Sequence, residues 1–260
     1  SKTFDNTPTF TWLPAPLAER HRLQIDNDPT FTSPIYDNSN LSGSDNQCTI
    51  ENQLPADNYY WRVGALVGGE WLWSGAMRLE IIESLSLILY PTHDAKVESA
   101  GPDTNYNAQG LAAAGPNPAY YRRSFLKFDL SGIPPDGSVA SAYLLLYKDG
   151  EGGGGDTNRS VGAYRVSDDS WSETTITWNN QPSIGSLENY ILTPGTTGFW
   201  ENWNVASWAD NQYKGDRILT IAIRMVDERT DWDSAEPYWR DREYSDATYR
   251  PRLVITVRQA

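Results

Sequence analysis

Segments with the alternation of β-strands, separated by clusters of Gly, Pro, Asn and Asp, run through this 260-residue chain and restrict what it can fold into. In residues 1–84 about seven short segments recur at roughly ten-residue spacing, which is the pattern of a small β-sandwich. Within Tyr60–Ala65, for example, Tyr60 would face opposite to Trp61. A second set of such segments follows from Leu85 onward. The pattern predicts an all-β protein.

The junction between the two sets contains no flexible linker. Glu80–Pro91 is short and apolar, and its alternation from Leu85 indicates that the second domain begins almost at once. We therefore expect a small sandwich over residues 1–84 and a larger one over residues 85–260, packed semi-rigidly.

Three segments of the larger domain carry specific expectations. Ala142–Tyr147 lacks clean alternation, so it should be a strand buried on both faces. The glycine-rich residues 151–156 (EGGGGD) should form a mobile loop tip. Residues 204–213 are expected to form a helix capped by Asn204.

Charge and cysteine content narrow the class of protein. The formal net charge is −13, and no basic block offsets it, so a nucleic-acid partner is not expected. No apolar run approaches the ~20 residues of a membrane helix. The polar start at Ser1 shows no signal peptide, which a secreted protein would have lost. Cys48 is expected to be a buried small hydrophobe. The composition suits an extracellular or cell-surface β protein that handles sugars.

The first domain resembles a known module. The motifs are "PTFTW", "HRLQIDNDPTF", "LPADNYYWRVGAL" and "WLWSGAMRLEI". Over residues 4–83 they resemble the fibronectin type III-like modules of secreted bacterial and archaeal proteins. The resemblance implies a spacer or adhesive β-sandwich, with Trp12, Tyr60 and Trp61 mainly in its core.

The second domain resembles a different family. Its ordered motifs are "PTHDAKVES" with "PDTNYN", "RRSFLKFDLSGIP", "VASAYLLLY", "SWSETTITWNNQP", "WNVASWADNQY" and "DREYSDATYRPRLVITV". Over residues 88–257 they resemble the DNRLRE domain of disaggregatase-related repeats and alginate-binding modules. Asn107 stands where the family usually has glycine, and Lys214–Asp216 replaces another motif. The resemblance implies a secreted jelly-roll sandwich, often calcium-bound, attached to polysaccharide-degrading or surface proteins.

A local cluster of arginines and aromatic residues precedes the last predicted strand. Aromatic faces stack on sugar C–H groups, and the guanidinium fork matches a uronic acid carboxylate. We expect an acidic-sugar site formed by Trp239, Arg240, Arg242, Tyr244 and Arg250. Further cations that could share its sheet face are Arg122, Arg123 and Lys127.

A structural interpretation of the same cluster stays open. The pairs Arg242–Glu243 and Arg250–Arg252 recur as a motif of the resembling family, so they could form an internal ion-pair lattice or an assembly contact. Elsewhere, core packing is favoured over sugar stacking for the tryptophans. Trp171 and Trp178 are expected in the core, and Trp200, Trp203 and Trp208 should pack the helix onto the sandwich.

Oxygen-rich loops predict a calcium site. Asp94, Asp103 and Asn105 flank an early strand, and calcium prefers six to eight oxygen ligands. Asx-turns explain the same residues equally well. A second acidic loop, residues 227–236, holds Asp227, Glu228, Asp231 and Asp233, which solvation alone can explain. Zinc is not expected from Cys48, His21 and His93.

The sequence gives catalysis little support, because no nucleophile or metalloprotease motif is present and no carboxylate pair stands out. We expect a non-catalytic carbohydrate-binding fragment of a secreted polysaccharide-active or cell-surface protein. Its partner would be a polysaccharide, and the expected acidic-sugar site would suit one that contains uronic acids. The alternative is a structural module for surface or matrix assembly, and a polysaccharide lyase or hydrolase has less support.

Overall fold

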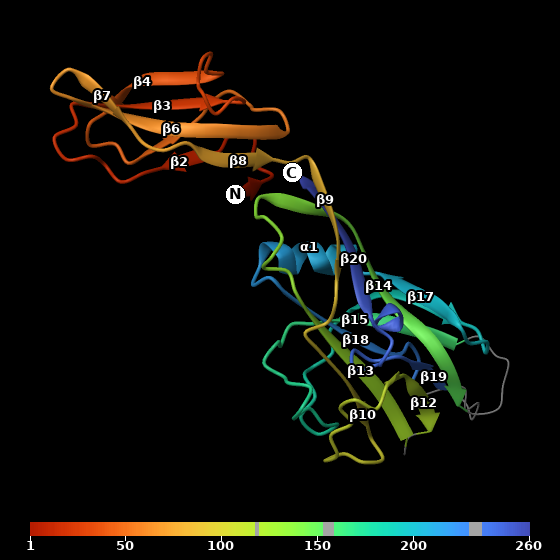
Figure 1. Cartoon of the computed structure of the whole chain (residues 1–260). Helices are drawn as coiled ribbons and strands as arrows, with labels where there is room; N and C mark the ends of the chain where they lie inside the picture. Colours follow the sequence, from red (N-terminus) through yellow and green to blue (C-terminus); the bar gives the residue numbers. More distant parts are fainter. Residues whose placement is uncertain (118–119, 153–158, 229–235) are drawn as a thin grey trace. The chain divides into compact units, whose positions relative to one another are not determined.

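The computed structural model describes residues 1–117, 120–152, 159–228 and 236–260 (Figure 1). The chain forms two compact units. The first comprises Ser1–Leu85, Pro134–Gly137 and Arg258–Ala260, and the second comprises Ser86–Ile133 and Ser138–Val257. Strands dominate both units, so the predicted all-β sandwich architecture is confirmed.

The first unit contains two sheets. The larger sheet has the order β1-β8-β6-β3-β4, with β7 also paired to β6, and the smaller pairs β2 with β5. Its core includes Leu23, Ile25 and the buried Cys48, as expected for that thiol. The strands are β1 (Lys2–Thr3), β2 (Thr9–Thr11), β3 (Arg20–Asp26), β4 (Tyr36–Ser42), β5 (Gln47–Thr49), β6 (Asp57–Val67), β7 (Glu70–Trp73) and β8 (Met77–Ile81).

One core expectation in this unit is wrong by a single residue. Tyr59 is 3% exposed and belongs to the core cluster, together with the partly buried Trp12 and Trp61. Tyr60 is not part of that cluster. Since successive strand residues face opposite sides, Tyr59 and Trp61 share the inner face and Tyr60 faces away.

The second unit packs two sheets against each other (Figure 1). One has the order β10-β13-β18-β15-β16 with β12 on β13, and the other β11-β19-β14-β20-β9 with β17 on β14. The strands are β9 (Ser84–Leu89), β10 (His93–Glu98), β11 (Leu111–Ala112), β12 (Ala114–Asn117), β13 (Tyr120–Asp129), β14 (Gly137–Gly152), β15 (Arg159–Val166), β16 (Leu187–Thr193), β17 (Phe199–Asn204), β18 (Ile218–Met225), β19 (Glu236–Trp239) and β20 (Arg252–Gln259).

Side chains between these sheets join the two layers. Trp203 is fully buried, and its indole N–H donates to the carbonyl of Val161 on the opposite sheet at 2.9 Å. Trp171 is also buried, and Trp178 packs against the same cluster. Core packing is therefore confirmed for Trp171, whereas Trp203, which was expected to pack the helix onto the sandwich, lies between the two sheets.

The predicted helix is present as α1 (Ala206–Lys214), one to two residues later than expected. Val205 is its N-cap residue and makes no side-chain capping bond. Asn204 nevertheless accepts a hydrogen bond from the Ala206 N–H at 3.0 Å, so it holds the first turn from one position earlier. Trp208 packs the helix onto β18 by donating to the Thr220 carbonyl at 2.9 Å.

The expectation for Ala142–Tyr147 is wrong. Ala142, Leu144 and Leu146 are fully buried, whereas Tyr143 is 39% exposed and Tyr147 is half-buried. The segment alternates like an ordinary one-sided strand, because the opposing sheet covers only its inner face. The expected loop tip at 151–156 lies outside the described residues from 153 onward; Glu151 and Gly152 end β14.

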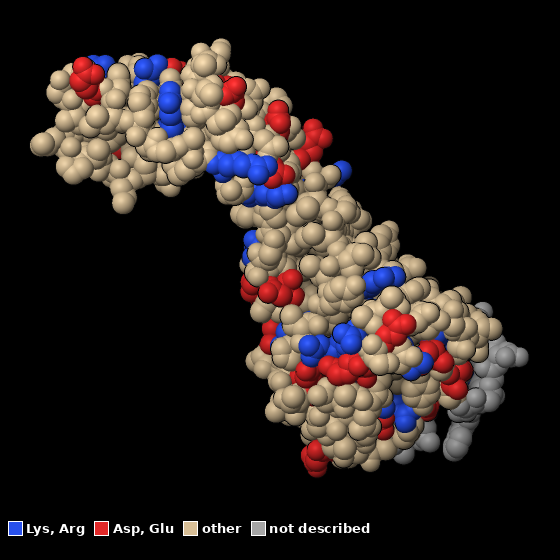
Figure 2. Space-filling model, in the orientation of Figure 1, with Lys and Arg blue, Asp and Glu red and all other residues tan. Residues whose placement is uncertain are grey.

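No helix in the described part of the chain is long and apolar enough to cross a membrane. On the face shown in Figure 2, basic and acidic side chains of the second unit lie next to one another. On this face the acidic side chains of the second unit thus lie beside basic ones and do not form one continuous acidic patch.

Candidate functional site

The predicted arginine–aromatic cluster lies between β19 and β20, where the chain forms a loop that ends in the 3-10 turn η1 (Ala247–Tyr249). Asp246 caps η1 by accepting the Thr248 N–H at 3.0 Å. Arg250 Nε donates to the Tyr244 carbonyl at 2.8 Å, which closes the loop on itself. The backbone N–H of Arg240 bonds to the Tyr147 carbonyl, so β14 fixes where the loop begins.

Trp239 does not offer a ring to a ligand. Its side chain is 1% exposed, packs edge-on against Trp203 with centroids 5.8 Å apart, and donates from Nε1 to Glu201 Oε2 at 2.7 Å. The residue faces inward because β19 pairs antiparallel with β14, where Trp239 lies opposite the buried Lys148. The expectation of a stacking platform at Trp239 is therefore wrong.

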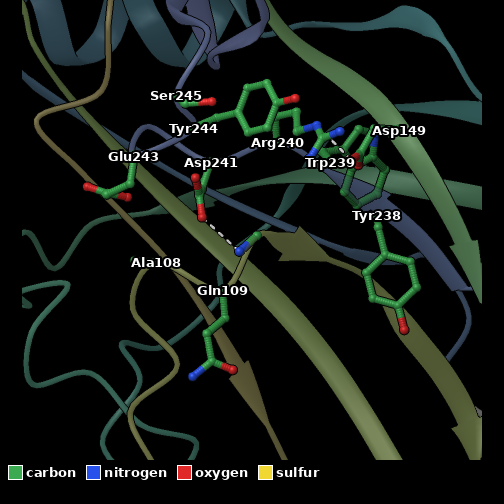
Figure 3. A pocket seen from close by; sticks show the side chains of 11 residues that line it. Ala108, Gln109, Asp149, Tyr238, Trp239, Arg240, Asp241, Glu243, Tyr244 and Ser245 are labelled. Carbon is green, nitrogen blue, oxygen red and sulfur yellow. Dashed lines mark hydrogen bonds and ion pairs between the residues drawn. The ribbon is translucent and has the colours of Figure 1, made fainter.

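A cavity of about 480 Å³ opens beside Trp239. Figure 3 shows Arg240, Tyr244 and Asp149 gathered at one end of this pocket, with Asp241 and Glu243 further along it. The guanidinium of Arg240 lies 3.8 Å from the Tyr244 ring centroid, and its Nε is 2.6 Å from Asp149 Oδ2. Arg240 is thus ion-paired inside the protein, as in the lattice interpretation of the sequence.

The pocket is acidic. Among the described residues that line it, Arg240 is the one basic side chain, against Asp149, Asp241 and Glu243. Burial raises the pKa of Asp149, although the Arg240 charge acts in the opposite direction. Asp241 Oδ2 accepts the Gly110 N–H at 2.7 Å (Figure 3). These carboxylates are suited to accept hydrogen bonds from hydroxyl groups.

The three cations of β13 do not share one face. Arg122 turns towards β19, where it contacts Glu236 and the Tyr238 hydroxyl, and it also bonds to Glu98. Because alternate residues face opposite sides, Arg123 and Lys127 lie on the other face. All three side chains are already engaged in the described structure.

The partners of Arg123 and Lys127 are both internal. The guanidinium carbon of Arg123 lies 4.5 Å from the Trp178 ring centroid, and Arg123 Nη2 lies 2.7 Å from Glu228 Oε2. Lys127 Nζ donates to the carbonyls of Asp169 and Trp171 at 2.7 and 2.6 Å. These contacts fit structural roles for both residues.

A second aromatic group lies on the outward face of β14, β17 and β20. Tyr147 contacts Trp200 edge-on at 5.4 Å and Tyr249 at 4.4 Å. Arg252 places its guanidinium 4.0 Å from the Trp200 ring centroid. Tyr249 is 36% exposed, and the other three side chains are half-buried. We call Tyr147, Trp200, Tyr249 and Arg252 the aromatic face.

Arg252 differs from Arg240 and Arg242, which are both ion-paired. Among the described residues no carboxylate forms an ion pair with it, and its Nε has no hydrogen-bond partner. Arg250 has no described ion pair either, and it lines a cavity of about 300 Å³ with Tyr90, Pro91, Arg242 and Ala247. The expected ion-pair lattice therefore includes Arg240 and Arg242 but stops before the Arg250–Arg252 motif.

An acidic cluster lies at the other end of the loop. Arg242 Nη1 is 2.6 Å from Glu173 Oε1 and 3.2 Å from Glu243 Oε1, and its backbone N–H donates to Asp94 Oδ2 at 2.9 Å. Burial, together with the charges of Glu243 and Asp241, raises the pKa of Asp94 well above its ordinary value. Burial also raises the pKa of Glu243.

The metal ligands expected from sequence are not assembled as a set. Asp103 accepts a hydrogen bond from Asn179, and Asn105 donates to the carbonyls of Glu173 and Ile176. Within the residues that the structure describes, Asp94 groups instead with Glu173 and Glu243. In the second acidic loop, Glu228 pairs with Arg123 and Arg224, whereas Asp231 and Asp233 lie outside the described residues.

Sequence reasoning missed the aromatic face and Glu173. Trp200 was assigned to helix packing, but it lies on the opposite side of β17 from Trp203. The alternation of Trp200, Asn202 and Asn204 with buried Glu201 and Trp203 was the available signal. Nothing in the spacing linked Glu173 to Asp94, since 79 residues separate them.

Comparisons with known proteins bear on this geometry. A gellan lyase of Bacillus sp is 38% identical over 177 residues, which is 65% of this chain and 7% of that protein, so the chain spans only a small part of this relative. A structure of infectious bursal disease virus Gx strain covers 97% of this chain and 59% of that chain, with 8% identity and a TM-score of 0.17, too low to bear on the fold. The model of carbohydrate-binding module family 96 matches residues 87–256. The chain therefore belongs to carbohydrate-binding module family 96.

Proposed function

We propose that this chain is a non-catalytic glycan-binding fragment of a larger secreted or cell-surface polysaccharide-active protein, and that the aromatic face holds an acidic glycan. The observation that carries the proposal is Arg252. Its guanidinium is stacked 4.0 Å from the centroid of Trp200 and has no ion pair among the described residues.

The chemistry of the aromatic face matches an acidic sugar. The flat faces of Trp200 and Tyr147 can pack against the C–H groups of a pyranose ring. The free edge of a guanidinium can form a bidentate contact with a uronic acid carboxylate. Because Arg252 has no internal carboxylate partner in the described structure, a ligand need not displace one. At Arg240, by contrast, a uronate would compete with Asp149 at 2.6 Å.

Long-range attraction does not support acidic-glycan binding, since the net charge of −13 repels a polyanion. Affinity must therefore come from short-range contacts, chiefly ring stacking and the Arg252 fork. The pocket of Asp149, Asp241 and Glu243 would accept hydrogen bonds from the hydroxyls of adjoining sugar units.

The relative suggests where the chemistry of a parent protein lies. The match to the gellan lyase covers 7% of that protein, so we propose that any polysaccharide cleavage belongs to other parts of a parent chain. Residues 1–84 would then be a fibronectin type III-like spacer, and residues 85–260 a DNRLRE-type jelly-roll domain. Gellan is the first polymer to test.

Isothermal titration calorimetry of the full chain tests this proposal. Titrants are gellan fragments, a uronic acid oligosaccharide and a neutral glucan oligosaccharide of equal length. Binding of the uronate or gellan that weakens about tenfold in Trp200→Ala would support the aromatic face, since about 1.4 kcal/mol is one decade.

Arg165→Gln is the matched control variant. Arg165 also lies over a tryptophan, Trp208 at 5.5 Å, but it is paired with Glu188 at 2.7 Å. The affinity of the Arg165→Gln variant for the uronate or gellan fragments should equal that of the unmodified protein. Absence of binding to all three titrants, or equal loss in both variants, would reject the site. Polymerisation without glycan binding would favour the alternative assembly role.

A further inference from the structure

Three carboxylates from distant parts of the sequence meet beside Arg242. Asp94 lies in β10, Glu173 follows β15, and Glu243 lies in the loop after β19. One carboxylate oxygen from each lies within 4.8 Å of the other two. Such a spacing between like charges is unfavourable unless something of opposite charge lies between or beside them.

The single neighbouring guanidinium does not balance this group. Arg242 Nη1 contacts Glu173 Oε1 at 2.6 Å and Glu243 Oε1 at 3.2 Å. The contact of Arg242 with Asp94 Oδ2 is made by its backbone N–H and not by its guanidinium. One guanidinium therefore faces three carboxylates, and negative charge remains in excess at the buried end of the cluster.

Asp94 supplies independent evidence of a missing partner. Its side chain is 1% exposed, and Oδ1 has no hydrogen-bond partner among the described residues. Buried polar atoms in native proteins almost always have a partner, because an unpaired one costs free energy. A carboxylate oxygen can be satisfied either by a donor or by a cation. The described residues supply no donor to Oδ1, and besides Arg242 the neighbouring side chains of the cluster are the acids Glu173 and Glu243.

We propose that Asp94, Glu173 and Glu243 hold a divalent cation of the calcium type. The donors are all carboxylate oxygens, which hard cations prefer, and calcium accepts an incomplete protein cage completed by water. His93 is the nearest residue in sequence that could attract zinc, but its ring packs edge-on against Trp171 with centroids 6.0 Å apart. The site replaces the sequence-predicted set by exchanging Asp103 and Asn105 for Glu173 and Glu243.

The proposed cation site includes a residue of the loop after β19, which also lines the pocket. Glu243 lines the 480 Å³ pocket, and Glu173 is anchored through its backbone carbonyl by Asn105 at 2.8 Å. A cation bound by these groups would neutralise one acidic wall of the pocket. It would also tie together β10, the loop after β15 and the loop after β19, which are far apart in the sequence.

Calorimetric titration of calcium chloride into the chelator-treated full chain tests the site without any glycan. The unmodified protein should bind one calcium ion saturably and melt at a higher temperature with calcium. Asp94→Asn and Glu243→Gln should each weaken calcium binding tenfold or more. Asp103→Asn removes a carboxylate of the same unit outside the cluster, so its affinity should stay within twofold.

Three results would overturn the inference. One is the absence of saturable binding at millimolar calcium, the weak end of the range for extracellular modules. Another is an affinity that Asp94→Asn and Glu243→Gln leave unchanged. The third is a loss in Asp103→Asn as large as theirs. If Asp94→Asn fails to fold, Glu243→Gln decides alone, because its side chain is 35% exposed and its replacement leaves the core intact.

Discussion

Both units of the protein stack arginines on tryptophans, but they balance the charges differently. In the first unit Arg62 lies 4.2 Å from the Trp73 centroid and Arg22 lies 5.7 Å from it. Arg22 forms a two-pronged contact with Asp37, and Gln24 bonds to both Arg62 and Asp37. In the second unit Arg252 stacks on Trp200 with no described carboxylate partner.

The contrast extends to the acids. The hydrogen bond from Arg22 lowers the pKa of Asp37, whereas burial raises the pKa of Asp94. Arg22 and Asp37 thus compensate each other, whereas Arg252 has no described carboxylate partner and Asp94 is buried beside other acids. An arginine–aromatic stack is therefore not informative by itself. What separates a structural stack from an available one is whether an internal side chain already bonds the guanidinium, as Asp37 bonds Arg22 and Gln24 bonds Arg62.

The largest effect should come from removing the uncompensated acid. At pH 7 without added metal, Asp94→Asn should raise the free energy of unfolding of the second unit by on the order of 1–3 kcal/mol. Burial and the charges of Glu243 and Asp241 penalise the ionised carboxylate, and asparagine removes that charge.

Scanning calorimetry at two pH values checks the sign. An acid whose folded-state pKa is raised destabilises the fold above its unfolded pKa, so the gain should shrink as the pH falls to about 4. A variant that is less stable than the unmodified protein at pH 7 would contradict the description of Asp94 as uncompensated.

Next in size is the loss of the aromatic platform. Trp200→Ala should reduce affinity for a uronate or gellan fragment by about tenfold or more, whereas Trp73→Ala should leave it unchanged. Titration calorimetry compares the two. Equal losses would show that the two stacks are not functionally different.

A smaller effect is expected from the guanidinium itself. Arg252→Gln should weaken uronate binding by several-fold and reduce its salt dependence, because the charge-assisted part of the contact is lost. Affinity measured at low and at high ionic strength tests this expectation. Arg22→Gln serves as the paired-arginine control, and its binding curve should match that of the unmodified protein at both salt concentrations.

The smallest effect concerns the paired acid of the first unit. Asp37→Asn should lower stability by at most about 1 kcal/mol, since the Arg22–Asp37 pair is partly exposed to solvent. The lowered pKa means that this contribution is present above about pH 4 and disappears as the pH falls further. A stability gain in Asp37→Asn, like that expected for Asp94→Asn, would remove the distinction between the two units.

The sequence predicted the all-β class and the helix, because these depend on local periodicity and composition. It failed where side chains had to be assigned to faces. The interior of the second unit contains the charged Lys148 and Glu201, at 0% and 4% exposure, and this obscured which tryptophans point outward. Trp239 was therefore given the role that the geometry favours for Trp200.

Long-range pairings could not be read from the sequence either. Arg240 meets Asp149 across paired strands, and Asp94 meets Glu173 and Glu243 through loops. The spacing of residues along the chain does not show which side chains come into contact in the fold. For this reason Asp103 and Asn105 were predicted as metal ligands together with Asp94. Whether calcium or a uronic acid is bound stays a prediction, and so do the fibronectin type III-like and DNRLRE-type assignments.

The stacking of Arg252 on Trp200 also has a thermodynamic consequence. A free arginine loses rotational freedom when it binds a ligand, at a cost of about 0.5–1.5 kcal/mol for a side chain of this kind. Here the guanidinium already rests on the indole, and Tyr147 and Tyr249 hold each other at 4.4 Å. The surface is therefore ordered before a sugar arrives, and more of the contact enthalpy would remain as affinity.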